Sequence, residues 1–109
     1  ADEKDPYIND FRSVFRRGSD VYLLDRLIVA GIIEARGCER FGLVGAALEE
    51  GPLKDFYQAI TASEAKHKDL FIELALEYFD APVVEQRLNE LLDFEAELVA
   101  KLPIRAALH

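Results

Sequence analysis

The sequence lacks the features that mark a secreted or membrane-spanning chain. Cys38 is the one cysteine among 109 residues, so no internal disulfide can form and nothing indicates an oxidising compartment. The apolar stretch 27–33 is interrupted by Gly31 and falls far short of the roughly 20 apolar residues that a membrane-spanning helix needs. No basic and then apolar signal-peptide pattern opens the chain. We therefore expect a cytoplasmic chain that does not enter a membrane.

Positive charge is also scarce. The chain carries 13 Lys and Arg residues against 21 Asp and Glu residues, a formal net charge of −8. This balance argues against non-specific binding to nucleic acid or anionic membrane, so any nucleic-acid contact must come from a local patch. Arginines do cluster, as Arg12, Arg16 and Arg17 and as the pair Arg36 and Arg40. Such groups are more often solvated or salt-bridged than phosphate-binding, and they bear on function only where a polyanionic substrate is argued on other grounds.

Apolar residues recur at three- and four-residue steps, which predicts helices. Caps and prolines place four of them, at about 6–17, 20–45, 52–79 and 82–101. Asp5-Pro6, Ser19-Asp20 and Asp80-Ala-Pro82 are the predicted starts of three helices, and Pro103 ends the last. No strand-like alternation is present, so residues 1–109 are predicted to form a single all-α domain or a fragment of one. Short loops make neighbouring helices antiparallel.

Three ionisable residues interrupt the predicted core faces. Glu64 and His67, in the run Glu64-Ala-Lys-His67, fall on the face of the third helix, and Glu34 falls on the face of the second. Burying such groups without partners costs several kcal/mol, so each must be neutralised, hydrogen-bonded or bound to a cation. The predicted faces are Leu24, Leu27, Ile28, Ala35, Cys38 and Phe41 in the second helix, Leu53, Phe56, Ile60, Phe71, Leu74 and Tyr78 in the third, and Leu88, Leu91, Leu92, Leu98 and Val99 in the fourth.

The three residues are predicted to lie at the same level of a helical hairpin. Glu34 precedes the loop near residue 48 by roughly 14 residues and Glu64 follows it by about as many, which places both about 20 Å from the turn. A Glu facing a Glu-x-x-His on an antiparallel neighbour is half of the ligand set of ferritin-like di-iron carboxylate bundles. Oxygen and imidazole ligands suit iron or manganese better than zinc. The predicted metal ligands are therefore Glu34, Glu64 and His67.

Other interpretations exist for these residues and their neighbours. A lone Glu-x-x-His occurs by chance in many helices, and the facing Glu34 is what favours a metal site. Glu39 competes with Glu34, but it lies about 140° around the helix, so both cannot face the same partner. Cys38 is most simply a small buried residue. Tyr57 and Tyr78 most simply pack with satisfied hydroxyls, although a tyrosine beside a di-iron site can take part in redox chemistry.

Two segments of the sequence resemble the signature segments of a known family. Residues 33–41, Ile-Glu-Ala-Arg-Gly-Cys-Glu-Arg-Phe, and residues 63–67, Ser-Glu-Ala-Lys-His, resemble the carboxyl-terminal half of the MiaE family, the tRNA 2-methylthio-N6-isopentenyladenosine hydroxylases. The resemblance runs from about Tyr7 through Leu102-Pro103-Ile104-Arg105, and its Glu-Ala-Arg-x-Cys-Glu-Arg-Phe run is specific.

The resemblance implies a fold, an activity and a set of partners. It implies a ferritin-like helical bundle with two non-haem iron ions that uses dioxygen as co-substrate to hydroxylate the isopentenyl group of a hypermodified tRNA adenosine. It further implies that Glu34 is a terminal ligand, Glu64 a bridging ligand and His67 the imidazole ligand. The implied partners are tRNA and an electron donor. Beyond the metal ligands, no catalytic residue is expected.

The chain lacks half of the metal-ligand pattern of the family. Family members carry a further helix pair with another Glu and another Glu-x-x-His, whereas the second histidine here is His109, at the terminus. Because the chain opens Ala-Asp-Glu-Lys-Asp without an initiator Met, we expect a processed chain or a fragment whose amino-terminal half supplies the other ligands. The alternative is a ferritin-like iron-binding or ferroxidase protein whose di-iron site is completed by a second copy of the chain. A metal-free helical interaction module leaves the three residues unexplained.

Overall fold

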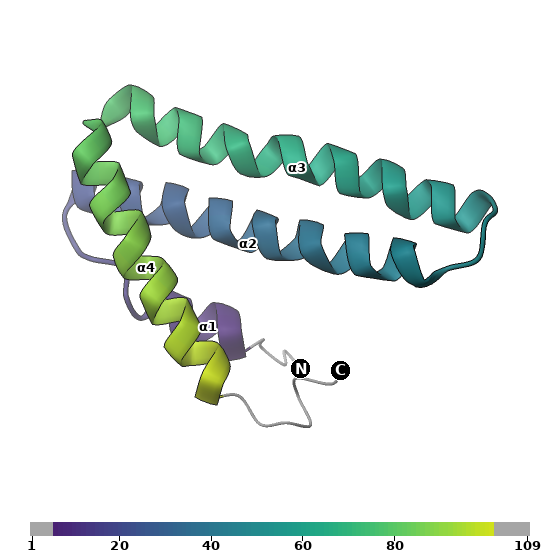
Figure 1. The fold of residues 1–109 in the computed structure, drawn as a ribbon. Helices are drawn as coiled ribbons and strands as arrows, with labels where there is room; N and C mark the ends of the chain where they lie inside the picture. Colours follow the sequence, from purple (N-terminus) through teal and green to yellow (C-terminus); the bar gives the residue numbers. More distant parts are fainter. Residues whose placement is uncertain (1–5, 102–109) are drawn as a thin grey trace.

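The computed structural model describes residues 6–101 and shows four helices, which are α1 Pro6–Arg12, α2 Ser19–Ala47, α3 Pro52–Tyr78 and α4 Ala81–Lys101 (Figure 1). No strand occurs in this range, so the predicted all-α class is confirmed. α2 and α3 form a long hairpin, while α4 runs from the end of α3 across the amino-terminal part of α2 and lies beside α1 (Figure 1). No helix within residues 6–101 combines the length and apolarity needed to cross a membrane.

The first helix is shorter than predicted, because it ends at Arg12 instead of near Arg17. The backbone N–H of Val14 donates to the Phe11 carbonyl at 3.2 Å, a tightened turn that closes the helix. The backbone N–H of Arg16 then donates to a carboxylate oxygen of Asp25 at 2.9 Å. Since this N–H is used by a residue of α2, it cannot continue the ladder of α1.

The other predicted helix starts fare differently. The prediction of Ser19-Asp20 as a cap is wrong, because Gly18 occupies the N-cap of α2 with a φ of 113° and no side chain caps the helix. α4 begins at Ala81, directly after Asp80, whose carbonyl accepts the backbone N–H of Val84 at 3.1 Å. The predicted cap at Asp5, the predicted stop at Pro103 and His109 lie outside the described residues.

Small residues of α2 let α3 approach closely. A Cβ added at Gly45 would stand 3.3 Å from the Cβ of Tyr57, and one added at Gly31 would stand 3.4 Å from a side-chain carbon of Ile72. These contacts fix which face of α3 meets α2, with Ala75 on the same face fully buried. A larger side chain at Gly45 would force the two helices apart.

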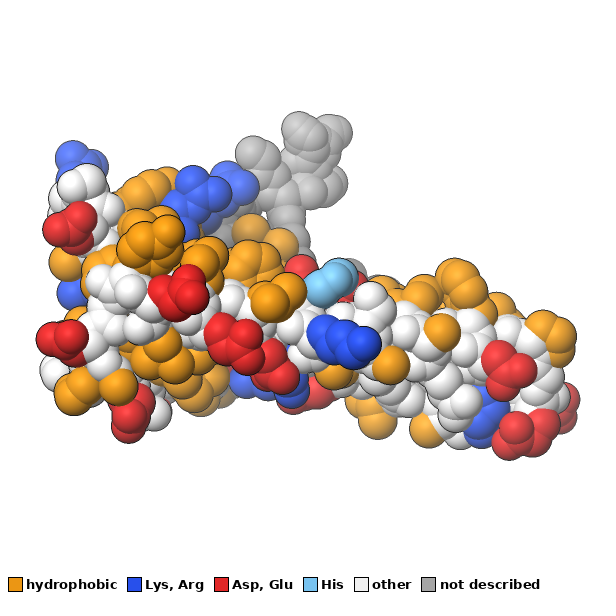
Figure 2. All heavy atoms as spheres, turned by 90° about the horizontal axis from the view of Figure 1, so that it is seen from above, with side chains coloured by type: hydrophobic (Ala, Val, Ile, Leu, Met, Phe, Trp, Pro, Cys, Tyr) orange, Lys and Arg blue, Asp and Glu red, His pale blue; other side chains and the backbone are white. Residues whose placement is uncertain are grey.

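The prediction of the third helix's core face is therefore wrong within this chain. Most of the predicted residues face outward, and together with another exposed leucine they form what we call the open stripe. Its members, with their exposed fractions, are Leu53 at 57%, Phe56 at 57%, Leu70 at 57% and Leu74 at 40%, and Tyr78 is exposed to 67%. The face that meets α2 lies about a third of a turn away. Hydrophobic side chains are visible along the exposed hairpin in Figure 2.

The core forms where α1, α2 and α4 meet. Phe11, Leu24 and Ile28 are buried there against α4, as predicted for the two α2 residues. Leu91 and Leu98 of α4 are also buried, while Val99, which was predicted to belong to that face, is 51% exposed. The core therefore occupies one end of the molecule and leaves the far end of the hairpin as two helices (Figure 1).

Two buried carboxylates join the elements around this core. Glu95 of α4 accepts two hydrogen bonds from the Arg36 guanidinium, at 2.7 and 2.6 Å, and one from the Tyr7 hydroxyl at 2.6 Å. Asp25 of α2 accepts hydrogen bonds from Arg16 and from Arg87 of α4. Each acid thereby ties α4 to α2 with fully paired charges, which is the condition for burying a carboxylate.

Candidate metal centre

The hairpin brings the three predicted ligands together. Glu34 lies near the middle of α2, and Glu64 and His67 lie three residues apart near the middle of α3. Because residues 48–51 make a short connection, the two helices run antiparallel from the turn and these positions meet. One oxygen or nitrogen atom from each of the three side chains lies within 4.8 Å of the others. No other group of three such side chains is gathered in this way among residues 6–101.

The three side chains differ in how far they are buried. Nδ1 of His67 lies 3.4 Å from a carboxylate oxygen of Glu64, and the side chains are 50% and 25% exposed. The prediction that both point into the core is wrong for His67, which lies on the face of α3 that carries the open stripe. Glu64 lies between that face and the face that meets α2. The group is thus open on one side of the hairpin.

Glu34 is the residue whose surroundings best suit a bound cation. Its Oε2 atom is buried and has no hydrogen-bond partner. A proton shared with the Glu64 carboxyl, burial and repulsion from the Glu64 charge raise the pKa of Glu34, and His67 opposes them. Two close carboxylates with an orphaned oxygen and an adjacent imidazole form a donor set that fits iron or manganese. The residues present therefore fit the metal that the sequence implied.

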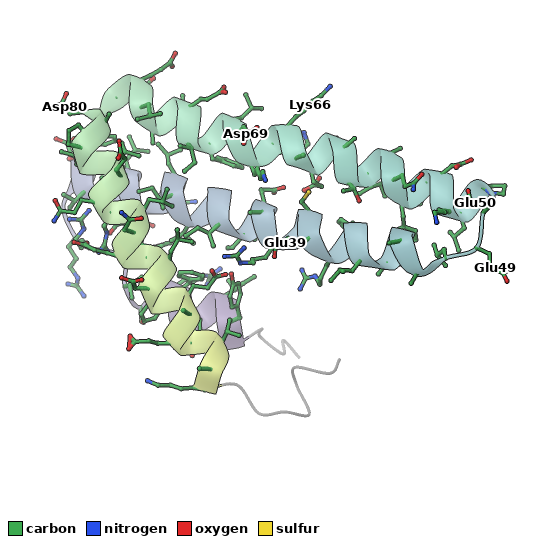
Figure 3. The ribbon with its side chains drawn as sticks, in the orientation of Figure 1. Glu39, Glu49, Glu50, Lys66, Asp69 and Asp80 are labelled. Atoms are coloured by element: carbon green, nitrogen blue, oxygen red, sulfur yellow. The ribbon has the colours of Figure 1, made fainter. Side chains whose placement is uncertain are left out.

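The neighbouring residues stay outside this group. Glu39 pairs with Arg36 at 2.9 Å and is 61% exposed, and its label in Figure 3 lies on the side of α2 away from α3. The Cys38 thiol donates to the Thr61 carbonyl at 3.5 Å across the hairpin. The Tyr57 ring packs against the Phe41 ring with centroids 6.1 Å apart. None of the three offers an atom to the carboxylate–imidazole group.

The sequence interpretation missed Asp25 and Glu95. Arg36, which binds Glu95, is two residues from Glu34, so this ion pair supports the segment of α2 that carries a candidate ligand. A signal was present, because Glu95 falls between Leu91 and Leu98 at steps of four and three on the buried face of α4. Asp25 likewise lies three residues before the buried Ile28 and four before the buried Val29.

Comparisons with known proteins indicate which family the chain resembles. The family described as tRNA-(MS[2]IO[6]A)-hydroxylase (MiaE) matches residues 3–109. The chain is 34% identical over 93 residues to the tRNA 2-(methylsulfanyl)-N(6)-isopentenyladenosine(37) hydroxylase of Pseudomonas putida, covering 85% of this chain and 45% of that protein. It is 32% identical over 93 residues to the protein of the same name from Salmonella typhimurium, covering 85% of this chain and 34% of that protein.

These comparisons also define how much of a relative the chain represents. The chain spans less than half the length of both curated relatives, at 45% and 34%. No solved structure matches the chain significantly.

Proposed function

Because the chain belongs to the MiaE family of tRNA hydroxylases, we propose that it is a segment of a dioxygen-dependent di-iron enzyme that hydroxylates the isopentenyl group of a hypermodified tRNA adenosine. The observation that carries the proposal is the meeting of Glu34, Glu64 and His67 in the middle of the hairpin, with donor atoms within 4.8 Å. The name that the two relatives share gives the substrate class and the reaction that we propose.

Each of the three residues has a part in holding iron. Glu34 and Glu64 contribute carboxylate oxygens from facing helices, and His67 contributes an imidazole nitrogen from the exposed side. Bound iron supplies the activation of dioxygen, which no amino-acid side chain performs. The helices supply a rigid frame, since the ligands stand on regular elements instead of loops. The buried side of Glu34 keeps water away from one half of the group.

The site requires ligands from outside the described residues. Three side chains are half of the set that a di-iron carboxylate bundle uses. The open stripe borders His67, and a row of large apolar side chains beside a polar group is the surface that a second helix pair would cover. We assign this covering role to the part of the longer protein that the chain does not span, because the matched segment covers less than half of each relative.

The alternative proposal is an iron-oxidising, ferritin-like protein completed by a second copy of the chain. One observation favours it, because a two-fold axis beside the open stripe would bring together two copies each of Glu34, Glu64 and His67 and bury both stripes. This protein would mineralise iron and would not bind tRNA.

The test measures iron content and product in the full-length protein. We expect bound iron in the purified protein and the addition of one oxygen atom to the modified adenosine of tRNA, read by mass spectrometry. Glu34→Ala and Glu64→Ala should each weaken iron binding by more than about tenfold, because each removes a direct ligand. Glu39→Ala is the matched control, since this acid lies outside the group, and it should keep its iron.

Two outcomes would count against the proposal. If the Glu34→Ala and Glu64→Ala variants each retain as much iron as the wild type, the metal binds elsewhere in the protein. Iron mineralisation without tRNA hydroxylation would favour the alternative protein, and the mass of the assembly would then be that of a symmetric dimer.

A further inference from the structure

A cleft rich in arginine lies between α1, the segment after it and α2. Its volume is about 690 Å³, and its lining includes Arg12, Arg16, Arg17 and Arg26. No Asp or Glu residue lines it. The whole chain carries a formal charge of −8, so the cleft is a positive site on an acidic protein.

Three of these arginines have charges that the described part of the chain does not neutralise. Arg16 is committed to the buried Asp25 through two side-chain hydrogen bonds at 3.0 and 2.8 Å. Arg12, Arg17 and Arg26 are exposed and form no ion pair with any residue among 6–101. Three guanidinium groups that lack an ion pair among residues 6–101 surround one cleft. They favour a ligand that carries several negative charges, because each group binds phosphate in a two-pronged geometry.

Aromatic rings lie in the same cleft. The Phe15 and Tyr22 rings stand edge to face with centroids 5.7 Å apart, and the Arg26 guanidinium lies 5.6 Å from the centroid of Tyr22. Tyr22 is 41% exposed, so a face of this arrangement is accessible. Arginine interleaved with aromatic rings is the combination that proteins use for RNA strands, where guanidinium groups bind phosphates and rings or guanidinium planes stack with bases.

The cleft runs along the same helix that carries Glu34, one of the candidate metal ligands. It follows α2 from Tyr22 to Ile33, and Ile33 is the residue before Glu34. Arg26 precedes Glu34 by eight residues, a rise of about 12 Å along the helix. Ile33 and Glu34 point about 100° apart around the helix, so the cleft and the metal group occupy different sides of α2. A small anion would not need three arginines spread over α1, the segment after it and α2.

We infer that the cleft lined by Arg12, Arg17, Arg26 and Tyr22 binds the phosphate backbone of the tRNA substrate, at a site separate from the metal ligands. This inference rests on the proposed function. The overall negative charge of the chain opposes RNA binding, so the contact with RNA must be confined to one local positive patch.

The test compares tRNA affinity in full-length variants. Arg12→Gln, Arg17→Gln and Arg26→Gln combined should weaken the binding of tRNA about tenfold or more at low salt. The slope of log affinity against log salt should fall by about 2 to 3, one for each lost phosphate contact. Arg17→Gln alone, placed in a segment outside any helix, should show a smaller loss of the same kind. The iron content of all variants should equal that of the wild type.

Lys66→Gln is the control. Lys66 is exposed and points away from α2 (Figure 3), so its loss should leave affinity and salt slope unchanged. Equal tRNA binding by the triple variant and the wild type would overturn the cleft assignment while hydroxylation by the wild type still upheld the proposed function. Absence of tRNA binding by iron-loaded wild type would overturn both.

Discussion

Arg87 of α4 donates hydrogen bonds to both carboxylate oxygens of Asp25 on α2, from Nε to Oδ1 at 2.7 Å and from Nη2 to Oδ2 at 3.1 Å. The two residues are 62 positions apart in the sequence. Asp25 is fully buried, and Arg16 adds hydrogen bonds from its side chain and its backbone N–H. Three elements therefore meet on one carboxylate. The same Arg16 lines the arginine-rich cleft, so Asp25 also fixes one wall of that cleft.

Replacing Asp25 should be costly. Asp25→Asn leaves Arg16 and Arg87 without their counter-charge at a buried point, and we expect the free energy of unfolding to fall by about 3 kcal/mol. The measurement is urea-induced unfolding followed by circular dichroism. Asp20→Asn is the matched control on the same helix, because Asp20 is exposed, and it should change stability by less than about 0.5 kcal/mol. Equal effects of the two substitutions would contradict the structural role of Asp25.

The same carboxylate predicts a dependence of stability on acid. Burial alone would raise the pKa of Asp25, but hydrogen bonds from Arg16 and Arg87 lower it from 3.8 to about 2. Because the pKa is lower in the folded state, the stabilisation is present above pH 3.8 and is lost as the pH falls through about 2. The shift corresponds to about 2 kcal/mol. The difference in free energy of unfolding between wild type and Asp25→Asn should therefore narrow by that amount as the pH falls from above 3.8 to below about 2. A difference that does not change with pH would refute the role given to Asp25.

The open stripe gives a prediction about the full-length protein. If a second helix pair covers it, Phe56→Ser and Leu70→Ser should each lower the free energy of unfolding by about 2–4 kcal/mol, as truncations in a core do. If the stripe stays in water, each should cost less than about 0.5 kcal/mol. Leu76→Ser is the control, because Leu76 is 45% exposed on the same helix but lies off the stripe. Small effects at Phe56 and Leu70 would show that nothing covers this face.

The sequence was sufficient to predict the meeting of Glu34 with Glu64 and His67. The rise of a helix is constant, so counting residues from a short turn gives the level of each side chain without knowledge of packing. Whether these three bind iron stays a prediction. The four helices could be predicted because apolar residues recur with the period of a helix. The end of α1 could not, because the helix stops early where the Asp25 carboxylate accepts the backbone N–H of Arg16.

Periodicity could not tell which partner covers an apolar face. The face with Leu53, Phe56 and Leu74 has the spacing of a core stripe, but the contacts of Gly31 and Gly45 turn a different face of α3 toward α2. The buried pairs of Asp25 and Glu95 were missed for a related reason. Their arginine partners Arg87 and Arg36 come from other helices, so the sequence around each acid shows only a charge where burial is expected.

Glu34 should oppose folding when no metal is bound. Its Oε2 is buried without a hydrogen-bond partner, and the neighbouring Glu64 carboxyl together with burial raises its pKa. In full-length protein freed of metal by a chelator, Glu34→Leu should raise the free energy of unfolding by about 1–3 kcal/mol, because it removes an unsatisfied buried group. Adding iron should then stabilise the wild type and leave Glu34→Leu unchanged, since only a site that binds in the folded state shifts the equilibrium. Glu39→Leu is the control and should respond to iron as the wild type does. A metal-free protein that loses stability on Glu34→Leu would mean that this carboxyl holds the hairpin together by itself, and the reason for placing a cation between α2 and α3 would disappear.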